Sequence, residues 1–413
     1  MLQRWYTGFA ATLVDGDVCL FEDDPPGLSP RPYHQESVIT ALACQHGGIQ
    51  VVRTYDHHFL VSRSPAGKRT DITDMIRDAF DTEPSSIADE IFACKKYVVV
   101  RTSRVLCMIG FDSKTGAFVI AQKLELESDI DLVSFDWGHG FVRTIDGTLR
   151  SFGKLNHYNT RGFDLSMRSA SFSVCTVAFS DTAHIAKIVC GPSCSLILMN
   201  DGKVYGEGKG HESPFVDWSR RGFCPVIFPD HVCIIKIAIN CNNIIYTSSD
   251  GSCYYGTTTG AGGISEDKCL HPVLVETLSG YFVENVFVLD ECVIVQYDGS
   301  KLCVLPMRQG HDRCYDTWYY LHYSCLLARE PIPISFFDDK NVIKVVQLKH
   351  RIGFVTEEGG MYESVFESYY SSKLTVDSLN INEVPFFENN PIAVQSPMQK
   401  IPSALSIDPQ LQN

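Results

Sequence analysis

The sequence lacks any long run of basic residues, and this absence limits the partners it can have. With 35 Lys and Arg against 49 Asp and Glu, the 413-residue chain carries a formal net charge of −14 at pH 7. A negative field of this size repels phosphate backbones, so we expect no direct binding to nucleic acid. The acidity either serves solubility, which is the interpretation we prefer, or suits a basic protein partner.

Long apolar stretches are also missing. No run approaches the ~18 apolar residues of a membrane-spanning helix, and Asp15 and Asp17 interrupt the N-terminal segment, which therefore does not resemble a signal peptide. The 16 cysteines are scattered singly, and no Asn-x-Ser/Thr glycosylation acceptor occurs. Together these absences predict an intracellular protein with reduced thiols, in the cytoplasm or the nucleus.

Motifs for catalysis and metal binding are missing as well. The sequence has no Gly-x-Ser-x-Gly elbow and no His-Glu-x-x-His helix motif. Cys190 and Cys194 are close in the chain, but the second pair of ligands that a structural zinc site requires is lacking. We therefore expect no metal, no cofactor and no catalytic residues, and a protein that is not an enzyme.

What the sequence does contain is a repeated unit. It consists of an apolar strand, a small or glycine-containing break, a second apolar strand, an Asp-Gly pair and a third apolar strand. The clearest copy runs from Ile185 to Gly191, from Ser195 to Met199, through Asp201-Gly202 and on to Gly206. Because glycine readily adopts positive φ and Asp tolerates turns well, we expect each Asp-Gly pair to form a hairpin tip.

Turn markers of this kind recur at a loose period of about fifty residues, which is typical of propeller blades. The markers are Asp15-Gly16, Asp56, Ser103, Asp146-Gly147, Asp201-Gly202, Asp250-Gly251, Asp298-Gly299 and Glu358. A hairpin pair cannot bury both of its faces alone, whereas four-stranded blades arranged radially shield one another. The repeat therefore predicts an all-β protein, a β-propeller with four-stranded antiparallel blades.

The repeat resembles that of the regulator-of-chromosome-condensation (RCC1-like) family. Its third strand ends in an aromatic-Gly pair, at Phe152-Gly153, Tyr205-Gly206 and Tyr255-Gly256, where the family usually has Trp-Gly. The family's His after the glycine break is replaced by Cys194, and the Gly-Gln-Leu-Gly ending is missing, so the chain looks like a degenerate member. The resemblance implies seven blades, which we prefer, with eight, the number of turn markers, as the alternative.

We expect the propeller to span residues 1–385, with loop insertions at about 61–90 and 307–330. In the first insertion Ile72, Met75, Ile76 and Phe80 have helical spacing, which predicts a short amphipathic helix packed back onto the propeller. In the second, the dense aromatic residues around Trp318 are either strand packing, which we prefer, or an interface hot spot. Residues 386–413 are rich in Pro, Ser, Gln and Asn and predict a disordered tail.

The functional hypothesis is a protein-interaction propeller that acts as a scaffold or regulator. The resemblance implies a partner such as a small GTPase, with the chain as its guanine-nucleotide exchange factor, or a chromatin or trafficking complex. The candidate partner-binding residues are an acidic loop, Glu22-Asp23-Asp24, the arginines of a duplicated Arg-Gly-Phe, Arg161 and Arg221, and Trp318. For the duplicated Arg-Gly-Phe a structural role is preferred, in which Phe packs between blades.

The alternative hypothesis is a propeller enzyme or a small-ligand-binding protein with its site at the central channel. That site requires polar groups converging from several blades. The apolar runs expected to line the channel contain single lysines, Lys236 and Lys344, with no carboxylate beside them. Strand alternation predicts that these lysines point outward.

Overall fold

Strands in the computed structural model pair in chain order, four at a time. The structure describes residues 2–5, 8–12, 18–24, 27–32, 39–44, 50–54, 57–62, 69–81, 91–93, 97–112, 114–136, 139–153, 175–177, 179, 181–191, 194–208, 223–239, 243–257, 272–289, 292–306, 330–347, 351–365 and 380–383. Within these residues the strands form eight four-stranded antiparallel sheets, each from four consecutive strands. The predicted all-β propeller with four-stranded blades is confirmed.

In the described residues, the first four blades contain strands β1 to β16 and one helix. Their bounds are β1 (Leu2–Trp5), β2 (Gly8–Thr12), β3 (Val18–Asp24), β4 (Gly27–Pro32), β5 (Ile39–Cys44), β6 (Gln50–Thr54), β7 (Phe59–Ser62), β8 (Thr70–Asp71), α1 (Thr73–Phe80), β9 (Ile91–Ala93), β10 (Tyr97–Arg101), β11 (Val105–Asp112), β12 (Ala117–Glu125), β13 (Ile130–Asp136), β14 (His139–Thr144), β15 (Leu149–Gly153) and β16 (Cys175–Thr176).

Among the residues that the structure describes, the other four blades contain strands β17 to β32 and three short 3-10 helices. Their bounds are η2 (Thr182–His184), β17 (Ile185–Cys190), β18 (Cys194–Met199), β19 (Val204–Gly208), β20 (Cys224–Val226), β21 (Ile234–Ile239), β22 (Asn243–Ser248), β23 (Cys253–Thr257), β24 (Val273–Leu274), η4 (Glu276–Leu278), β25 (Val283–Val288), β26 (Cys292–Tyr297), β27 (Lys301–Pro306), β28 (Ile332–Ile334), η5 (Ser335–Phe337), β29 (Val342–Gln347), β30 (Arg351–Thr356), β31 (Met361–Val365) and β32 (Asn380–Glu383).

The number of blades corrects the preference for seven. Each of the eight turn markers falls between the second and third strands of one sheet, so the count of eight replaces seven. The preference for seven came from the resemblance to the RCC1-like family. Each blade needs one turn between its second and third strands, so the turn markers count the blades directly.

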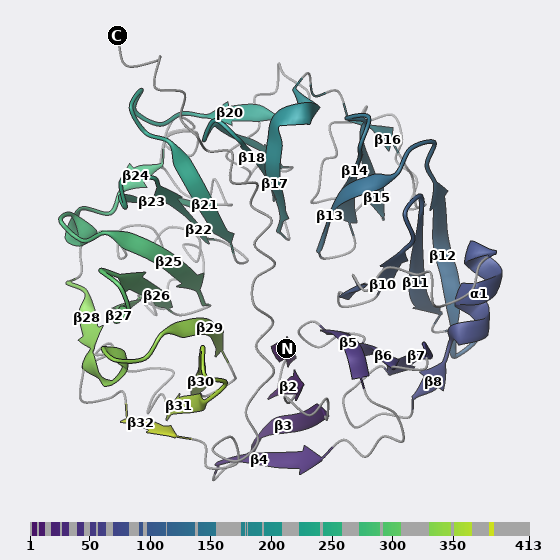
Figure 1. Cartoon of the computed structure of the whole chain (residues 1–413), viewed down its shortest axis with the longest axis horizontal. Helices are drawn as coiled ribbons and strands as arrows, with labels where there is room; N and C mark the ends of the chain where they lie inside the picture. The colour runs from purple at the N-terminus through teal and green to yellow at the C-terminus, as the bar shows by residue number, and fades with distance from the viewer. Residues whose placement is uncertain are drawn as a thin grey trace, which may run out of the picture.

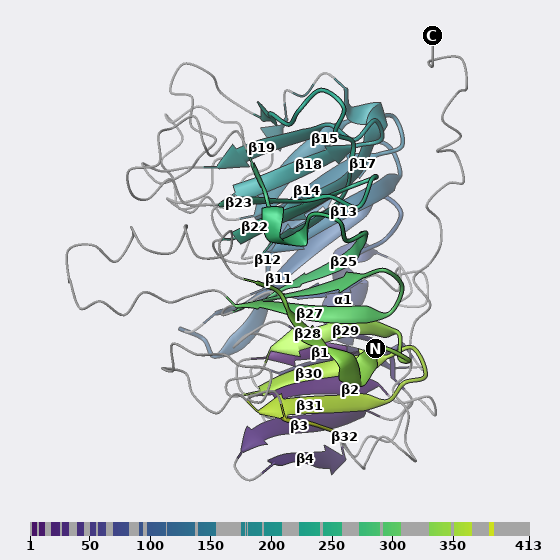
Figure 2. The same ribbon diagram turned by 90° about the vertical axis from the view of Figure 1, so that its left-hand side faces the viewer.

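The blades are arranged around a common centre (Figure 1). The first strands of several neighbouring sheets contact one another, as β1 does with β5, β13 with β17 and β21 with β25, so the first strand of each blade is innermost. In the side view of Figure 2 the strands cross the thickness of the ring. Residues near the ends of these strands therefore lie on one of the two faces of the ring.

The hydrophobic core is divided into clusters that lie between neighbouring blades. One of them joins β18 to β21 and β22 through Leu196, Ile237, Ile244 and Tyr246, and comparable clusters lie at the other junctions from blades 2 and 3 to blades 7 and 8. Every residue of β18 is buried, because a middle strand is covered on both faces by the adjacent blades. This explains why the middle strands are continuous apolar runs in the sequence.

Helix α1 lies at the outer edge of the ring beside β11 and β12 (Figure 1). Ile72, Ile76, Ala79 and Phe80 are buried in the cluster between blades 2 and 3, and Met75 packs against it. The prediction of a helix packed back onto the propeller is therefore confirmed. Residues 307–329, which are all but the last residue of the other predicted insertion, and residues 384–413, which contain the predicted tail, lie outside the described residues.

Candidate functional site

Because each blade is antiparallel with its first strand innermost, the described turns between second and third strands lie on one face of the ring, which we call the turn face. At two junctions the glycine carbonyl of the turn accepts a hydrogen bond from the first residue of the next blade. The amide of Ile234 donates to Gly202 at 3.1 Å, and the amide of Val283 donates to Gly251 at 3.0 Å. The predicted hairpin turns are thus present, and at these two junctions they are hydrogen-bonded to the neighbouring blade.

The aspartates of these turns hold the backbone in place. Asp146 Oδ1 accepts hydrogen bonds from Thr144 Oγ1 at 2.6 Å and from the Thr148 amide at 2.9 Å. Asp250 Oδ1 accepts from the Ser248 hydroxyl and from the Ser252 amide. In both turns the pKa of the carboxyl is lowered from 3.8. The larger cause is the hydrogen bond from the hydroxyl, and the next is the hydrogen bond from the amide. The turn aspartates are therefore ionised at neutral pH.

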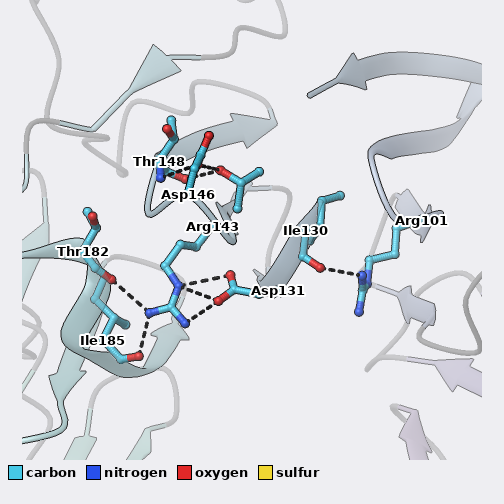
Figure 3. A network of polar contacts seen from close by, with 9 residues as sticks. Arg101, Ile130, Asp131, Arg143, Asp146, Thr148, Thr182 and Ile185 are labelled. Carbon is cyan, nitrogen blue, oxygen red and sulfur yellow. Dashed lines mark hydrogen bonds and ion pairs between the residues drawn. The ribbon is translucent and has the colours of Figure 1, made fainter. Parts of the chain in front are cut away.

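Arg143, on β14, joins blades 4 and 5 (Figure 3). Its Nε and Nη2 donate to the carboxylate of Asp131, with a shortest distance of 2.7 Å. Its Nη1 donates to the carbonyls of Thr182 at 3.0 Å and Ile185 at 2.8 Å, where the next blade begins. Only 13% of the Arg143 side chain is exposed. The arginine therefore positions the first strand of blade 5.

Polar side chains also link other pairs of adjacent blades. Arg101, on β10, donates to the carbonyl of Ile130 at 3.4 Å (Figure 3). At the junction of blades 7 and 8, Gln296 Nε2 donates to Asn341 Oδ1 at 2.8 Å. Sequence reasoning did not identify these residues, although a signal exists. Val-Arg-Thr occurs three times, at residues 52–54, 100–102 and 142–144, once in each of three successive blades.

The innermost strands share a β-bulge, and a polar residue follows it in four blades. The register shifts after the first residue of β17, β21, β25 and β29. The residues after the bulge are Lys187, Lys236, Asn285 and Lys344. This recurrence explains why single lysines were visible in the apolar runs of the sequence.

Lys236, which strand alternation predicts to point outward, contacts the next blade. Its Nζ donates to the carbonyl of Glu284 at 2.5 Å and to Asn285 Oδ1 at 2.7 Å, both on the innermost strand of the next blade. Burial lowers the pKa of Lys236, and the charge of Glu284 opposes this shift. Lys236 thus links two blades, which is a structural role.

A cavity of about 360 Å³ opens on the turn face between blades 6 and 7, and we call it the blade 6–7 cavity. Its lining residues come from the Asp-Gly turn of blade 6, from β23 and β24, from η4 and from the segment that leads into β25. They are Asp250, Ser252, Cys253, Leu274, Val275, Leu278, Ser279, Gly280, Tyr281 and Phe282.

Large apolar side chains are exposed around this cavity. Tyr281 is 40% exposed and Phe282 49%, and Leu274 and its neighbour Val273 are also exposed. By contrast, Val275 and Leu278 are buried and connect the cavity wall to the core between blades 6 and 7. The exposed apolar side chains are therefore next to residues that are anchored in the core. Burial raises the pKa of the Cys253 thiol in the lining to about 12, so this thiol is not a nucleophile at neutral pH.

Of the predicted partner-binding residues, the structure describes Glu22, Asp23 and Asp24. Glu22, Asp23 and Asp24 form the end of β3 and pair with Ser29, Leu28 and Gly27 of β4, so the expected acidic loop is instead a strand. Asp is common in turns, which favoured a loop here, but the run continues β3 as far as Asp24, which pairs with Gly27 of β4. Arg161, Arg221 and Trp318 lie outside the described residues.

One member of the duplicated Arg-Gly-Phe is described, namely Phe223. Its ring centre lies 5.7 Å from that of Phe141 in the preceding blade and 5.9 Å from that of Phe179. This is the contact between blades that the structural interpretation of the motif requires. Cys190 and Cys194, which were considered as metal ligands, are both buried.

Comparisons with known proteins identify the fold. No family model matches the sequence, and no match was found among curated proteins. The solved structure of human WBSCR16 is 14% identical, with a TM-score of 0.50 over 83% of this chain and 82% of that chain. Yeast RCC1 (Prp20), in its crystal structure bound to Kap60, is 13% identical, with a TM-score of 0.50 over 76% of this chain and 80% of that chain.

At this level of identity the likeness concerns the fold. The chain has a β-propeller fold similar to that of RCC1, as the repeat in its sequence predicts. Within the described residues, no helix is both long enough and apolar enough to cross a membrane.

Proposed function

We propose that this chain is a protein-interaction propeller that contacts its partner through the turn face. The observation that carries the proposal is the group of exposed apolar side chains around the blade 6–7 cavity, which includes Leu274, Tyr281 and Phe282. Exposed aromatic side chains next to a cavity are typical of binding sites for proteins, because their large surface is desolvated when a partner covers it.

The fold supports the same proposal. In a propeller the blades fix the loops and turns of each face rigidly, so that a partner can bind without a costly rearrangement of the surface. The yeast RCC1 structure is an example of this fold bound to a protein, Kap60. The proposed mechanism involves no covalent chemistry, and the propeller acts as a scaffold or regulator.

A more specific form of the proposal is guanine-nucleotide exchange on a small GTPase. An exchange factor accelerates nucleotide release because it binds the nucleotide-free GTPase more tightly than the loaded form. This requires a rigid surface that competes with the nucleotide, and the turn face is the surface we assign to that role. The resemblance of the repeat to that of the RCC1-like family motivates this form of the proposal.

Affinity purification of the full chain from its native cells at low salt, followed by mass spectrometry, tests the general proposal. Recovery of a reproducible partner that is lost with a variant of the turn face would support it. Any small GTPase recovered is then loaded with fluorescent GDP. Faster release on addition of the propeller would support exchange, and an unchanged release rate would leave a scaffold.

A further inference from the structure

The blade 6–7 cavity combines an apolar interior with one acidic wall. Leu274, Val275, Leu278, Tyr281 and Phe282 supply apolar surface. The acidic group is Asp250, which is the only charged residue among the ten that line the cavity. An apolar side chain of a ligand therefore finds apolar surface here, while a basic group next to it finds a carboxylate.

The charge of Asp250 is maintained by the turn that holds it. Its Oδ1 accepts a hydrogen bond from the Ser252 amide at 3.0 Å and another from the Ser248 hydroxyl, which fixes the carboxylate at the cavity wall. Asp250 is exposed, so a ligand can reach it. The chain as a whole carries a net charge of −14, which adds a long-range attraction for a basic ligand.

Tyr281 and Phe282 provide a second reason to expect a cation. The faces of exposed aromatic rings attract Lys and Arg side chains through cation–π interactions. Tyr281 is held in place, since its ring centre lies 4.7 Å from that of Tyr297 in an edge-on arrangement. A cation that enters the cavity therefore has both a carboxylate and exposed aromatic rings among the residues that line it.

The size of the cavity limits what enters it. Its volume of about 360 Å³ is at the lower end of the ~300–1,000 Å³ found for small-molecule pockets. It has room for a short stretch of side chains but not for a folded element. A peptide segment that inserts an apolar side chain with its neighbour fits this description.

From these features we infer that the blade 6–7 cavity binds a peptide segment in which an apolar side chain is next to Lys or Arg. This inference rests on the proposed interaction function and specifies its site and the chemistry of its partner. The partner segment contributes the apolar anchor, and Asp250 with the Tyr281 ring selects the basic neighbour.

Fluorescence anisotropy with three labelled short peptides tests this inference on the full chain. The peptides have Gly-Ser flanks and a central Phe-Arg, Phe-Glu or Ala-Arg. We expect Phe-Arg to bind at least about threefold more tightly than either of the others, because each lacks one of the two interactions. Asp250→Asn should reduce the preference for Arg over Glu, with the net charge of the chain left to favour Arg weakly, while it keeps the hydrogen bonds of the turn, and Tyr281→Ala should weaken Phe-Arg by about fivefold.

A matched control is Phe336→Ala, which removes another exposed aromatic side chain, one that does not line this cavity. This variant should bind Phe-Arg as the unmodified chain does, and thermal unfolding of all variants should establish that they are folded. Equal binding of the three peptides, or no effect of both Asp250→Asn and Tyr281→Ala, would overturn the inference.

The purification experiment separates this inference from the proposed function. If partners are recovered equally with the unmodified chain and with the Asp250→Asn, Tyr281→Ala double variant, the interaction function stands and the blade 6–7 cavity is the wrong site. If the unmodified chain recovers no partner, the proposed function fails, whatever the peptides show. Selective peptide binding with loss of partners in the double variant supports both.

Discussion

Gly251 combines two requirements that only glycine meets at once. Its φ is +81°, and a Cβ added there would lie 2.6 Å from Cδ2 and 2.8 Å from Cα of Phe282 at the start of the next blade. Gly299 occupies the equivalent turn one blade later with φ +92°, yet a Cβ there would meet no atom within 4 Å. The two positions therefore differ in their surroundings but not in their backbone conformation.

We predict that Gly251→Ala lowers the free energy of unfolding by about 3 kcal/mol, of which the positive φ contributes about 1 kcal/mol and the contact with Phe282 the rest. Gly299→Ala is the matched control and should cost about 1 kcal/mol, because it has the backbone cost alone. Chemical denaturation of the purified chain measures both. Equal losses would mean that the close approach of the two blades at Gly251 contributes nothing.

These turns also show which features of a residue are visible in a sequence. The Asp-Gly pairs identified the hairpins correctly because the chemistry of a tight turn is local to two or three residues. The contact of Gly251 with Phe282 was not visible, because it depends on how the following blade is placed. In the same way, the end of β3 was interpreted as a loop, since the charges of Glu22, Asp23 and Asp24 hide the pairing with β4.

At the scale of the strand, Arg143 donates hydrogen bonds to groups of two adjacent blades. Its guanidinium satisfies one carboxylate and two carbonyls at the start of blade 5. Arg104 also pairs with an aspartate, Asp129, at 2.8 Å, but 60% of its side chain is exposed. These two arginines provide a comparison between a partly buried junction and an exposed ion pair.

We predict that Arg143→Gln costs about 2–3 kcal/mol of unfolding free energy, because it leaves the Asp131 carboxylate and two carbonyls of the blade junction without their donor. Arg104→Gln should cost less than about 1 kcal/mol, because exposed ion pairs contribute little. Hydrogen exchange followed by mass spectrometry should show faster exchange in β17 for the first variant only. Similar stability of the two variants would contradict a positioning role for Arg143.

Helix α1 is the one described α-helix of the ring, and it contributes to the core between blades 2 and 3. Ile76 has no exposed surface there, so Ile76→Ala should lower the unfolding free energy by about 2–4 kcal/mol. Asp78→Ala, on the exposed side of the same helix, should change it by no more than about 0.5 kcal/mol. Thermal unfolding of both variants distinguishes a helix that supports the core from one that only covers a loop.

The element scale also explains what the sequence predicted well and what it did not. Helix α1 was found because Ile72, Met75, Ile76 and Phe80 follow the helical period, which is a local signal. The role of Arg143 was missed because two of its acceptors are carbonyls of a neighbouring blade, and carbonyls carry no sequence signal. Repetition of Val-Arg-Thr in three blades was the available evidence, since a residue that recurs at one blade position serves either the fold or a shared surface.

At the scale of the whole molecule, the Asp-containing turns connect local chemistry to the stability of the ring. Asp146, Asp201 and Asp250 lie in the turns of three successive blades, 4 to 6, and the pKa of each carboxyl is lowered from 3.8. For Asp201 burial raises the pKa, and the hydrogen bonds and charge of Lys203 outweigh this effect. Two of these turns, at Gly202 and Gly251, also accept the hydrogen bond that starts the next blade.

A lowered pKa in the folded state determines the sign of the pH dependence. The unfolded carboxyls titrate near 3.8, so the stabilisation is fully present above that pH, and it is lost as the pH falls through the lower folded values. We therefore predict that the urea midpoint of the chain decreases as the pH falls below about 4. The double variant Asp146→Asn, Asp250→Asn keeps an acceptor in each turn but has no charge to titrate. Its midpoint at neutral pH should be lower than that of the unmodified chain, and its decrease in acid should be smaller. An identical decrease in both proteins would place the acid sensitivity elsewhere. A smaller decrease in the double variant would show that protonation of the turn carboxylates weakens the turns that connect neighbouring blades.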